Sequence, residues 1–331
     1  SVVISGIPAG AQVTGAILLP PVNVGDAPRW VATAAAVNGG AVHVTPPPDF
    51  SGTMNITVEG IARNVNLQSA TTGPQIVPIL VDPVADGVAI GASPAAGSED
   101  LPIALGLSLG EVDTDGSEDI GVFCYVKLTN GATVIGGYPA VAAGDSDATI
   151  DGTSLVGYYR VPTSSAASLQ IQPALNWHGS IGVTVAAYSV EPVDSTPDAD
   201  NTKLSTSNFT VSVTAVADAP AVSAPATVSG SEDTAIALTD GVTLLSAALA
   251  DTVADNGAEV LSVKISGVPD GSRFSSGSNN GDGSWTIPVS ALATLSLTPP
   301  LNYSGTMTLT LTAITLELSN GNEAQTSVNF N

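Results

Sequence analysis

Along much of this chain, apolar and polar residues alternate, which is the pattern of β-strands buried on one face. One such stretch puts Met54, Ile56 and Val58 on one face, with Asn and Thr between them. Equivalent stretches occur later in the chain, and their apolar positions are Ile181, Val183 and Val185, then Phe209, Val211 and Val213, and finally Met307, Leu309 and Leu311. The pattern predicts a chain built mainly of strands.

Helical periodicity is nearly absent, and only residues 244–250 are expected to form one short helical turn. The 34 glycines and 23 prolines are spread along the chain rather than clustered, which indicates many short strands joined by turns. Hydrophobic residues make up 44% but aromatic residues only 4%, so we expect cores of Val, Ile, Leu and Ala. The predicted fold class is all-β, with immunoglobulin-like β-sandwiches in tandem.

An internal repeat organises the chain. Residues 4–10 read ISGIPAG and residues 265–271 read ISGVPDG, and a tryptophan follows each string, at Trp30 and at Trp285. Residues 47–54 (PPDFSGTM) match residues 300–307 (PLNYSGTM) in the same way. A more divergent middle copy contains residues 173–181 (PALNWHGSI), with Tyr159 in the place of the tryptophan. These landmarks recur in the same order at roughly 126 to 133 residues, so three copies of one domain are predicted.

Shared flanking strings give the predicted boundaries. Residues 97–100 and 230–233 both read GSED, and residues 84–86 and 216–218 both read VAD. The predicted domains are residues 1–86, residues 87–218 with insertions around 144–154 and 191–202, and residues 219–331. Ser1 aligns with Ser262, about forty residues into the third copy, so the first copy lacks its opening strands in this sequence. Two explanations stay open: the chain is a fragment, or those strands come from elsewhere.

The charge balance narrows the range of partners. Acidic residues outnumber basic ones by 30 to 7, which gives a formal net charge of −23. We expect no nucleic-acid partner, because nucleic-acid binding draws its affinity from Lys and Arg, and anionic membrane surfaces are disfavoured for the same reason. Two interpretations of the acid remain: it keeps a long surface protein soluble, or bound divalent cations neutralise it.

Cysteine and histidine positions argue against catalysis. Cys124 is the only cysteine, so no intrachain disulfide can form, and its apolar neighbours predict a buried structural thiol. His43 lies in an alternating run and His178 in the repeated turn, and neither has a nucleophile or metal partnership in the sequence. We therefore do not expect an enzyme. No run of about 18 apolar residues occurs, so membrane insertion is not expected, and no signal peptide opens the sequence.

An aromatic residue occupies the same turn in all three copies, at Phe50, Trp177 and Tyr303. These rings could stack on sugars, and Tyr158 and Tyr159 could join them. The residue type varies while the position holds, which favours a ring that plugs the end of each sandwich.

The Ser-Glu-Asp opening, the Ile-Ser-Gly-Val-Pro string, the tryptophan before a strand, the aromatic turn and the Val-Ala-Asp closing together resemble a known family. They are similar to the tandem extender repeats of very large bacterial adhesins of the repeats-in-toxin type, which type I systems secrete. The resemblance covers essentially the whole chain and is tightest in the first and third copies. It implies cadherin-like or immunoglobulin-like sandwiches in an elongated array, calcium at the domain junctions and an extracellular place on the bacterial cell surface. The nonapeptide calcium repeat of such adhesins does not occur in this sequence.

Acidic residues gather around the predicted junctions, where they are candidate calcium ligands. Calcium accepts six to eight oxygen ligands in flexible geometry, so carboxylates from two adjoining domains could converge on one ion. The candidates at the first junction are Asp86, Glu99, Asp100, Asp113, Asp115 and Glu118, and those at the second are Asp218, Glu232, Asp233, Asp251, Asp255 and Glu259. Glu118 aligns with Glu259, and the close pair Asp113 and Asp115 makes the first junction the better candidate. In the alternative interpretation, these acids cap turns or stay solvated.

Three functions are compatible with the sequence. The first is a structural extender, the stalk of a bacterial surface adhesin, stiffened by calcium for attachment or biofilm formation; its partners would be neighbouring repeats or identical chains, and the ligand of the parent adhesin would bind elsewhere. The second is a self-assembling extracellular filament in which donor strands pass between chains. The third and weaker is a carbohydrate-binding module.

Overall fold

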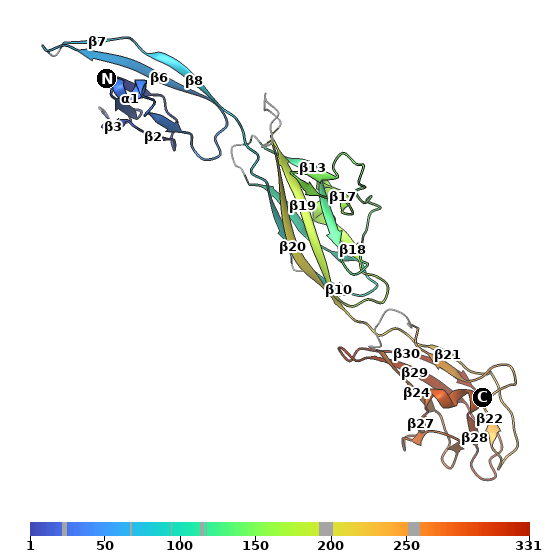
Figure 1. Ribbon diagram of the computed structural model, residues 1–331. Helices are drawn as coiled ribbons and strands as arrows, with labels where there is room; N and C mark the ends of the chain where they lie inside the picture. The colour runs from blue at the N-terminus through green and yellow to red at the C-terminus, as the bar shows by residue number, and fades with distance from the viewer. Residues whose placement is uncertain are drawn as a thin grey trace.

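The computed structural model describes residues 1–21, 25–66, 68–93, 95–112, 116, 118–191, 201–250 and 259–331. These residues form three β-domains that follow one another along an elongated molecule, with the N-terminus in the first and the C-terminus in the third (Figure 1). We call them copies one, two and three and use the predicted ranges 1–86, 87–218 and 219–331 as their names. Almost every regular element is a strand, so the predicted all-β fold class is confirmed.

Copy two has a five-stranded sheet in the order β10-β20-β19-β13-β17, faced by the smaller sheets β11-β18-β14 and β12-β9, and β15 and β16 form a separate hairpin. Its elements are β9 (Val88–Ala92), β10 (Ala95–Ser98), β11 (Ile103–Ala104), β12 (Leu107–Glu111), β13 (Asp119–Leu128), β14 (Thr133–Val134), β15 (Thr149–Ile150), β16 (Thr153–Ser154), β17 (Tyr159–Pro162), the 3-10 helix η1 (Thr163–Ser168), β18 (Gln170–Gln172), β19 (Gly179–Val190) and β20 (Thr202–Thr214).

The core of copy two follows the predicted alternation. Ile181, Val183 and Val185 of β19 are buried on one face, and Val211 and Val213 of β20 pack beside them. Such cores hold the sandwich together because each buried aliphatic side chain contributes about 1.5–3 kcal/mol relative to an exposed one.

Copy three repeats this plan with the sheets β26-β27-β24-β29-β30, β22-β28-β25 and β21-β23. Its elements are β21 (Ala221–Ser223), β22 (Ile236–Ala237), β23 (Ser246–Ala248), β24 (Glu259–Ser266), β25 (Arg273–Phe274), β26 (Ser278–Asn279), β27 (Ser284–Thr286), the 3-10 helix η2 (Val289–Thr294), β28 (Ser296–Thr298), β29 (Leu309–Glu317) and β30 (Glu323–Phe330). Leu309 and Leu311 are buried as predicted, whereas Met307 lies just before β29 and is partly buried.

Copy one has the smallest core. Its main sheet runs β3-β4-β1-β6-β7, with β8 also paired to β6, and β2 pairs with β5. Its elements are β1 (Val2–Ser5), β2 (Gln12–Thr14), β3 (Ile17–Leu19), β4 (Arg29–Ala32), the helix α1 (Ala34–Asn38), β5 (His43–Thr45), β6 (Gly52–Arg63), β7 (Ser69–Thr71) and β8 (Gln75–Val81). Its core cluster consists of the buried residues Ile4, Ile7, Met54 and Ile56, and Trp30 packs against them.

The helical turn expected at residues 244–250 is wrong. Residues Ser246–Ala248 instead form β23, which pairs with β21 in antiparallel register. Alanine and leucine are good helix formers, but intrinsic propensity is worth little per residue, and pairing with a neighbouring strand overrides it. Within the described ranges, no helix has the length and apolar character that a membrane span would need.

Cys124 lies in β13 and is fully buried in the core of copy two, as predicted. Burial raises the pKa of its thiol to about 11. A thiol with such a pKa stays protonated at neutral pH and is a poor nucleophile, so this residue contributes packing.

The insertion in copy two lies over the outer face of the main sheet. Residues from the insertion, such as Val141 and Leu155, form a second small core with Tyr125 and Ala186 of the sheet. The hairpin β15–β16 belongs to this cover, which has no equivalent among the described residues of copies one and three.

An ionic cluster fastens the insertion to the sheet. The Arg160 side chain donates to Asp147 through Nε at 2.6 Å and to Asp145 through Nη2 at 2.9 Å. The Tyr125 hydroxyl donates to the same Asp147 carboxylate at 2.7 Å. Partial burial raises the pKa of Asp147, but the hydrogen bonds from Arg160 and Tyr125 outweigh that effect, so the pKa lies below its ordinary value of 3.8.

We expect Asp147→Asn to lower the free energy of unfolding of copy two by about 1–3 kcal/mol at pH 7, because it removes a charged hydrogen-bond acceptor. The folded pKa lies below the unfolded one, so this stabilisation is present above about pH 4 and is lost as the pH falls through the folded pKa. Denaturant unfolding should be measured at pH 7 and at an acid pH below the folded pKa. The parent and the variant should differ in free energy of unfolding at pH 7 and not in acid. The exposed Asp119→Asn serves as control, and an equal difference at both pH values would contradict an ionic contribution.

Candidate functional site

Two glutamates face each other at the end of copy three that adjoins the linker. Glu259 begins β24 and Glu317 ends β29, and the two are direct partners in the antiparallel register. Glu259 is 8% exposed and Glu317 is 0% exposed. Like charges directly opposite each other on a sheet are destabilising, and burying them away from water adds a further cost. This arrangement therefore needs a compensating partner.

Copy two contains the same pair. Glu118 precedes β13 and Glu191 follows β19, one residue beyond the register pair of Asp119 with Val190. Both glutamates are 4% exposed. The paired carboxylates thus occur at the equivalent end of two consecutive copies.

One oxygen of the first glutamate in each pair holds the linker that leads into its copy. The Asp218 N–H donates to Glu259 Oε1 at 2.8 Å. In copy two, the N–H groups of Asp86 and Gly87 both donate to Glu118 Oε1. The closing Val-Ala-Asp string of one copy is therefore bound through its backbone to the next copy.

Each pair also contains a buried carboxylate oxygen that the linker does not contact. Glu118 Oε2 and Glu317 Oε2 are buried and accept no hydrogen bond. A buried carboxylate oxygen without a donor loses its hydration with no replacement, at a cost of about 1–3 kcal/mol or more for a charged group. A cation at these oxygens would remove that cost.

Glu99 lies at the opposite end of copy two from the one expected. Its own N–H donates to the Thr214 carbonyl oxygen at 3.0 Å, and its Oε1 accepts from the Val216 N–H at 2.6 Å. The buried Glu99 is therefore part of the second junction, and its expected position at the first junction is wrong. The strands β9 and β10 explain the difference, because together they carry the chain from the first junction to the other end of copy two.

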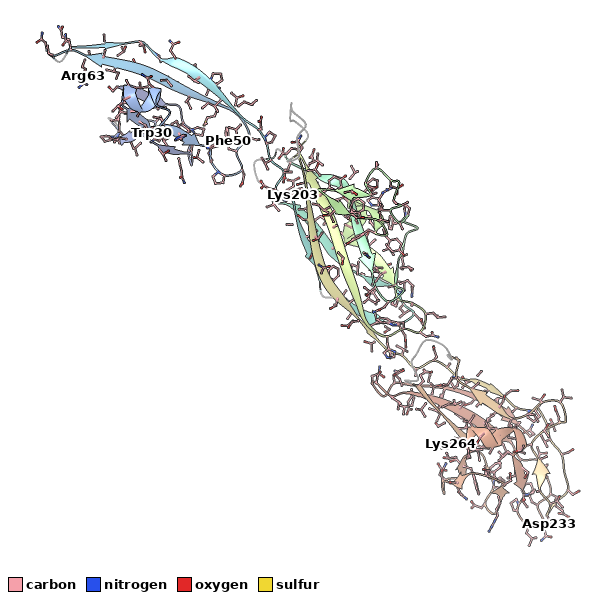
Figure 2. All side chains as sticks on the ribbon, in the orientation of Figure 1. Trp30, Phe50, Arg63, Lys203, Asp233 and Lys264 are labelled. Atoms are coloured by element: carbon pink, nitrogen blue, oxygen red, sulfur yellow. The ribbon has the colours of Figure 1, made fainter. Side chains whose placement is uncertain are left out.

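Glu232, the aligned residue in copy three, is exposed. It precedes Asp233, which Figure 2 shows at the far end of copy three, away from copy two. The assignment of Glu232 and Asp233 to the second junction is therefore also wrong.

Asp100 and Asp233 stabilise the aromatic turn of their own copies. Asp100 Oδ1 accepts from the Asn176 N–H at 2.8 Å, and Asp233 Oδ1 accepts from the Asn302 N–H at 2.8 Å. Both aspartates have positive φ, 60° and 57°, a region that Asp and Asn tolerate better than most residues. The interpretation that acids cap turns holds for these two residues.

The remaining predicted ligands divide into two groups. Asp86 and Asp218 lie at the junctions and contribute the backbone contacts described above. Asp113, Asp115, Asp251 and Asp255 lie outside the described residues, so the expectation that the first junction is the better site stays a prediction. Among the residues that are described, no group of three or more His, Cys, Asp or Glu side chains converges closely enough to hold a metal ion.

A hollow of about 530 Å³ lies at the first junction. Phe50 and the preceding prolines of the aromatic turn line one side, and Asp82, Asp86 and Glu191 contribute carboxylates to it. The hollow therefore joins the end of copy one to the glutamate pair of copy two.

Sequence reasoning missed Glu191 and Glu317, although a signal was present. Glu191 is twelve positions after Gly179 of the repeated turn, and Glu317 is twelve positions after Gly305. Copy one has Asn64 at the same distance from Gly52. The shared offset identifies the second glutamate of each pair without any structure.

Two of the three turn aromatics, Phe50 and Trp177, pack against the core of their copy, whereas Tyr303 lines a pocket of copy three outside its core cluster. Phe50 contacts the core of copy one, and Trp177 and Tyr159 contact the core of copy two. Tyr158 packs on the separate cluster under the insertion. These rings do not line one exposed face, which disfavours a sugar-binding platform.

No protein-family model matches the chain, and no curated protein is a significant match. Among solved structures, the protocadherin GammaB4 extracellular domain is 10% identical with a TM-score of 0.35; the match covers 100% of this chain and 42% of that one. Drosophila N-cadherin EC1-4 is 14% identical with a TM-score of 0.27, over 98% of this chain and 67% of the other. The Yersinia pseudotuberculosis adhesin InvE is 15% identical with a TM-score of 0.24, over 74% of this chain and 58% of the other.

This chain thus spans less than half the length of the protocadherin structure. The solved structures to which it is similar include cadherin domains and a bacterial adhesin. With TM-scores of 0.35 and below, these likenesses carry no argument about function, which has to come from the junctions themselves.

Proposed function

We propose that this chain is a structural extender of an extracellular protein, the stalk of a bacterial surface adhesin, and that calcium binds at its domain junctions. The observation that carries the proposal is the buried pair of glutamates at the linker end of copies two and three. Attachment or biofilm formation would be the role of the parent protein, with its ligand bound elsewhere.

Calcium suits these pairs for a physical reason. Two carboxylates that face each other in a buried site repel, and a buried charge without a compensating partner strongly destabilises the fold. Calcium prefers carboxylate and backbone oxygens, tolerates irregular geometry, and is bound by many extracellular modules at about 0.1–1 mM. The oxygens of Glu118 and Glu317 that lack a donor fit a cation ligand.

The proposed ligands at the second junction centre on the pair Glu259 and Glu317, with Glu99 of copy two nearby on the same linker. At the first junction they centre on Glu118 and Glu191, with Asp86 on the linker. Because no three of the described carboxylates converge, each site would need ligands from outside the described residues as well. We also propose Asp113, Asp115, Asp251 and Asp255 as ligands, because they precede the first glutamate of each pair by a few residues.

The linker contacts explain how such a site would stiffen the array. At the second junction, Glu99 holds the Val216 N–H and Glu259 holds the Asp218 N–H. Between them, the Ala217 N–H donates to Asn322 Oδ1 at 2.9 Å, and Asn320 Nδ2 donates to the Ala215 carbonyl oxygen at 2.7 Å. Residues of both copies therefore make hydrogen bonds to four consecutive linker residues, 215–218. A cation that neutralises the nearby carboxylates would reduce their repulsion and so preserve these bonds.

The filament alternative has less support. Within the described residues, every strand pairs with a strand of its own copy, and this pairing gives no support to an exchange of strands between chains. The carbohydrate alternative is disfavoured by the packed rings described above. For an extender, the expected partners are neighbouring repeats and cations, and we propose no catalytic activity.

Thermal unfolding tests the calcium proposal. In about 1–5 mM calcium we expect a higher melting temperature than in chelator, because a ligand at a 1- to 50-fold excess over a Kd of about 0.1–1 mM stabilises the folded state by about 0.4–2.3 kcal/mol per site. Small-angle scattering of the same samples should give a longer and stiffer particle with calcium. Unchanged melting and unchanged scattering would overturn the proposal and leave the acids as solubilising charge.

A variant of the glutamate pair separates site binding from general charge effects. We expect Glu317→Gln to lose most of the calcium-induced gain in melting temperature of copy three, and to be at least as stable as the parent in chelator because the repulsion with Glu259 is gone. The control is Glu323→Gln, an exposed residue at the start of β30 that removes the same charge. Equal calcium responses of the two variants would contradict the assignment of the pair.

A further inference from the structure

The chain enters copy two at one end and leaves it at the opposite end. The chain enters at the end that adjoins copy one, runs through β9 and β10, and leaves through β20 at the end that adjoins copy three (Figure 1). The strands β10 and β20 lie side by side and run in the same direction, with Ala95 opposite Val211 and Ser98 opposite Thr214. This is the one parallel pair among the strand pairs of the described residues.

This geometry determines how tension would act on copy two. A pull on the two ends of the molecule draws β10 toward copy one and β20 toward copy three. The two parallel strands are then displaced along their own axes, so the hydrogen bonds between them are loaded in shear. Bonds loaded in shear share the force and have to break together, whereas the bonds of a peeled hairpin break one after another.

Further contacts extend the β10–β20 pair to the linker. The Glu99 N–H continues the ladder to the Thr214 carbonyl oxygen at 3.0 Å, and the Glu99 carboxylate then holds the Val216 N–H at 2.6 Å. On the inner side, Val211 and Val213 are buried in the core. Slipping β20 past β10 would therefore also pull apolar side chains out of the sandwich, which raises the barrier.

Copies three and one differ in this feature. In copy three the same parallel pairing begins, since the Val228 N–H donates to the Asn331 carbonyl oxygen at 2.7 Å and the Asn331 N–H donates to the Ala226 carbonyl oxygen at 3.2 Å. In copy one no described residue pairs with the outer edge of β8, and Ile76 and Leu80 there are exposed. The described chain thus has one fully formed parallel pair, in copy two.

We propose that β10 and β20 form a mechanical clamp that carries tensile load through copy two. The inference builds on the proposed extender function, because a stalk that holds a cell to a surface is pulled at both ends. It assigns the load to a ladder of backbone hydrogen bonds, which do not use an ion. The clamp predicts an order of failure under force, in which copy one yields first and copy two last.

Single-molecule pulling on the full chain, held at its two ends, tests the clamp. In chelator we expect the event of highest force to lengthen the chain by about 40 nm, because residues 95–214 would extend by roughly 3.3–3.6 Å each. The event is governed by the unfolding rate under force rather than by equilibrium stability. Copy three, with residues 219–331, would lengthen the chain by a similar amount, about 37–41 nm, so the variants below identify the copy that gives the event. A highest-force event with the shorter length of copy one would overturn the proposal.

The informative variant is Ser212→Pro. The Thr214 carbonyl points to β10, so the N–H of Ser212, two residues earlier on the same side of the strand, also points to β10, and proline removes it. We expect the force of the 40 nm event to fall by about half or more. The matched control is Leu155→Ala, which weakens the separate cluster under the insertion and should lower the melting temperature of copy two without lowering that force. Equal losses of force in the two variants would contradict the clamp.

A second pair of substitutions covers the case in which Ser212→Pro does not fold. Ala96 and Ser212 are opposite each other and exposed, so Ala96→Cys with Ser212→Cys can be cross-linked. In the oxidised protein the highest-force event should vanish while the lengthening of copy three remains, and a reductant should restore that event at the parent force. A highest-force event that persists after cross-linking would overturn the proposed path of force. Because both experiments are read in chelator, a failure of the clamp is distinguishable from a failure of calcium to stiffen the junctions.

Discussion

The repulsion between two buried carboxylates is the constraint on which the junctions of this protein depend. Glu259 and Glu317 face each other across two strands, and Glu118 and Glu191 repeat the arrangement one copy earlier. One oxygen of the first glutamate binds the incoming linker, while the opposing glutamate keeps the site strongly negative. A divalent cation that binds there would join the end of one copy to the start of the next, so the angle between copies would depend on the same ion.

The linker contacts and the parallel strands of copy two are connected through one residue. Glu99 ends the ladder between β10 and β20 through its N–H and holds the linker through its carboxylate. A pull transmitted through the linker therefore reaches the ladder directly. The proposed stiffness of the junction and the proposed resistance of the sandwich to tension would depend on adjoining parts of one strand.

The sequence predicted the fold well, because its signals are local and repeated. Alternation along residues 181–185 and 209–213 identified strands whose apolar faces are buried. The apolar residues on either side of Cys124 in the sequence identified it as a core residue. The helical turn at residues 244–250 was wrong because strand pairing, a nonlocal effect, overrides a weak helical preference. The same limit applies to all short segments whose partners lie far away in the sequence.

The site was predicted only in part. Glu118 and Glu259 were found by alignment between copies, but their partners Glu191 and Glu317 were not recognised, since a cross-strand pair depends on register rather than on sequence distance. Glu99 was assigned to the nearer junction because it follows Asp86 closely, yet β9 and β10 together carry the chain to the other end of copy two. The turn contacts of Asp100 and Asp233 depend on positive φ angles, which the pattern of residue types did not predict.

The most direct test of the central claim is a crystal structure of the chain grown in millimolar calcium, with anomalous scattering measured at a long wavelength. The account predicts an anomalous peak within coordination distance of Glu259 and Glu317 and another near Glu118 and Glu191, at about 2.3–2.6 Å from carboxylate oxygens. Glutamate pairs that bind only water or a neighbouring side chain in such a crystal would contradict it.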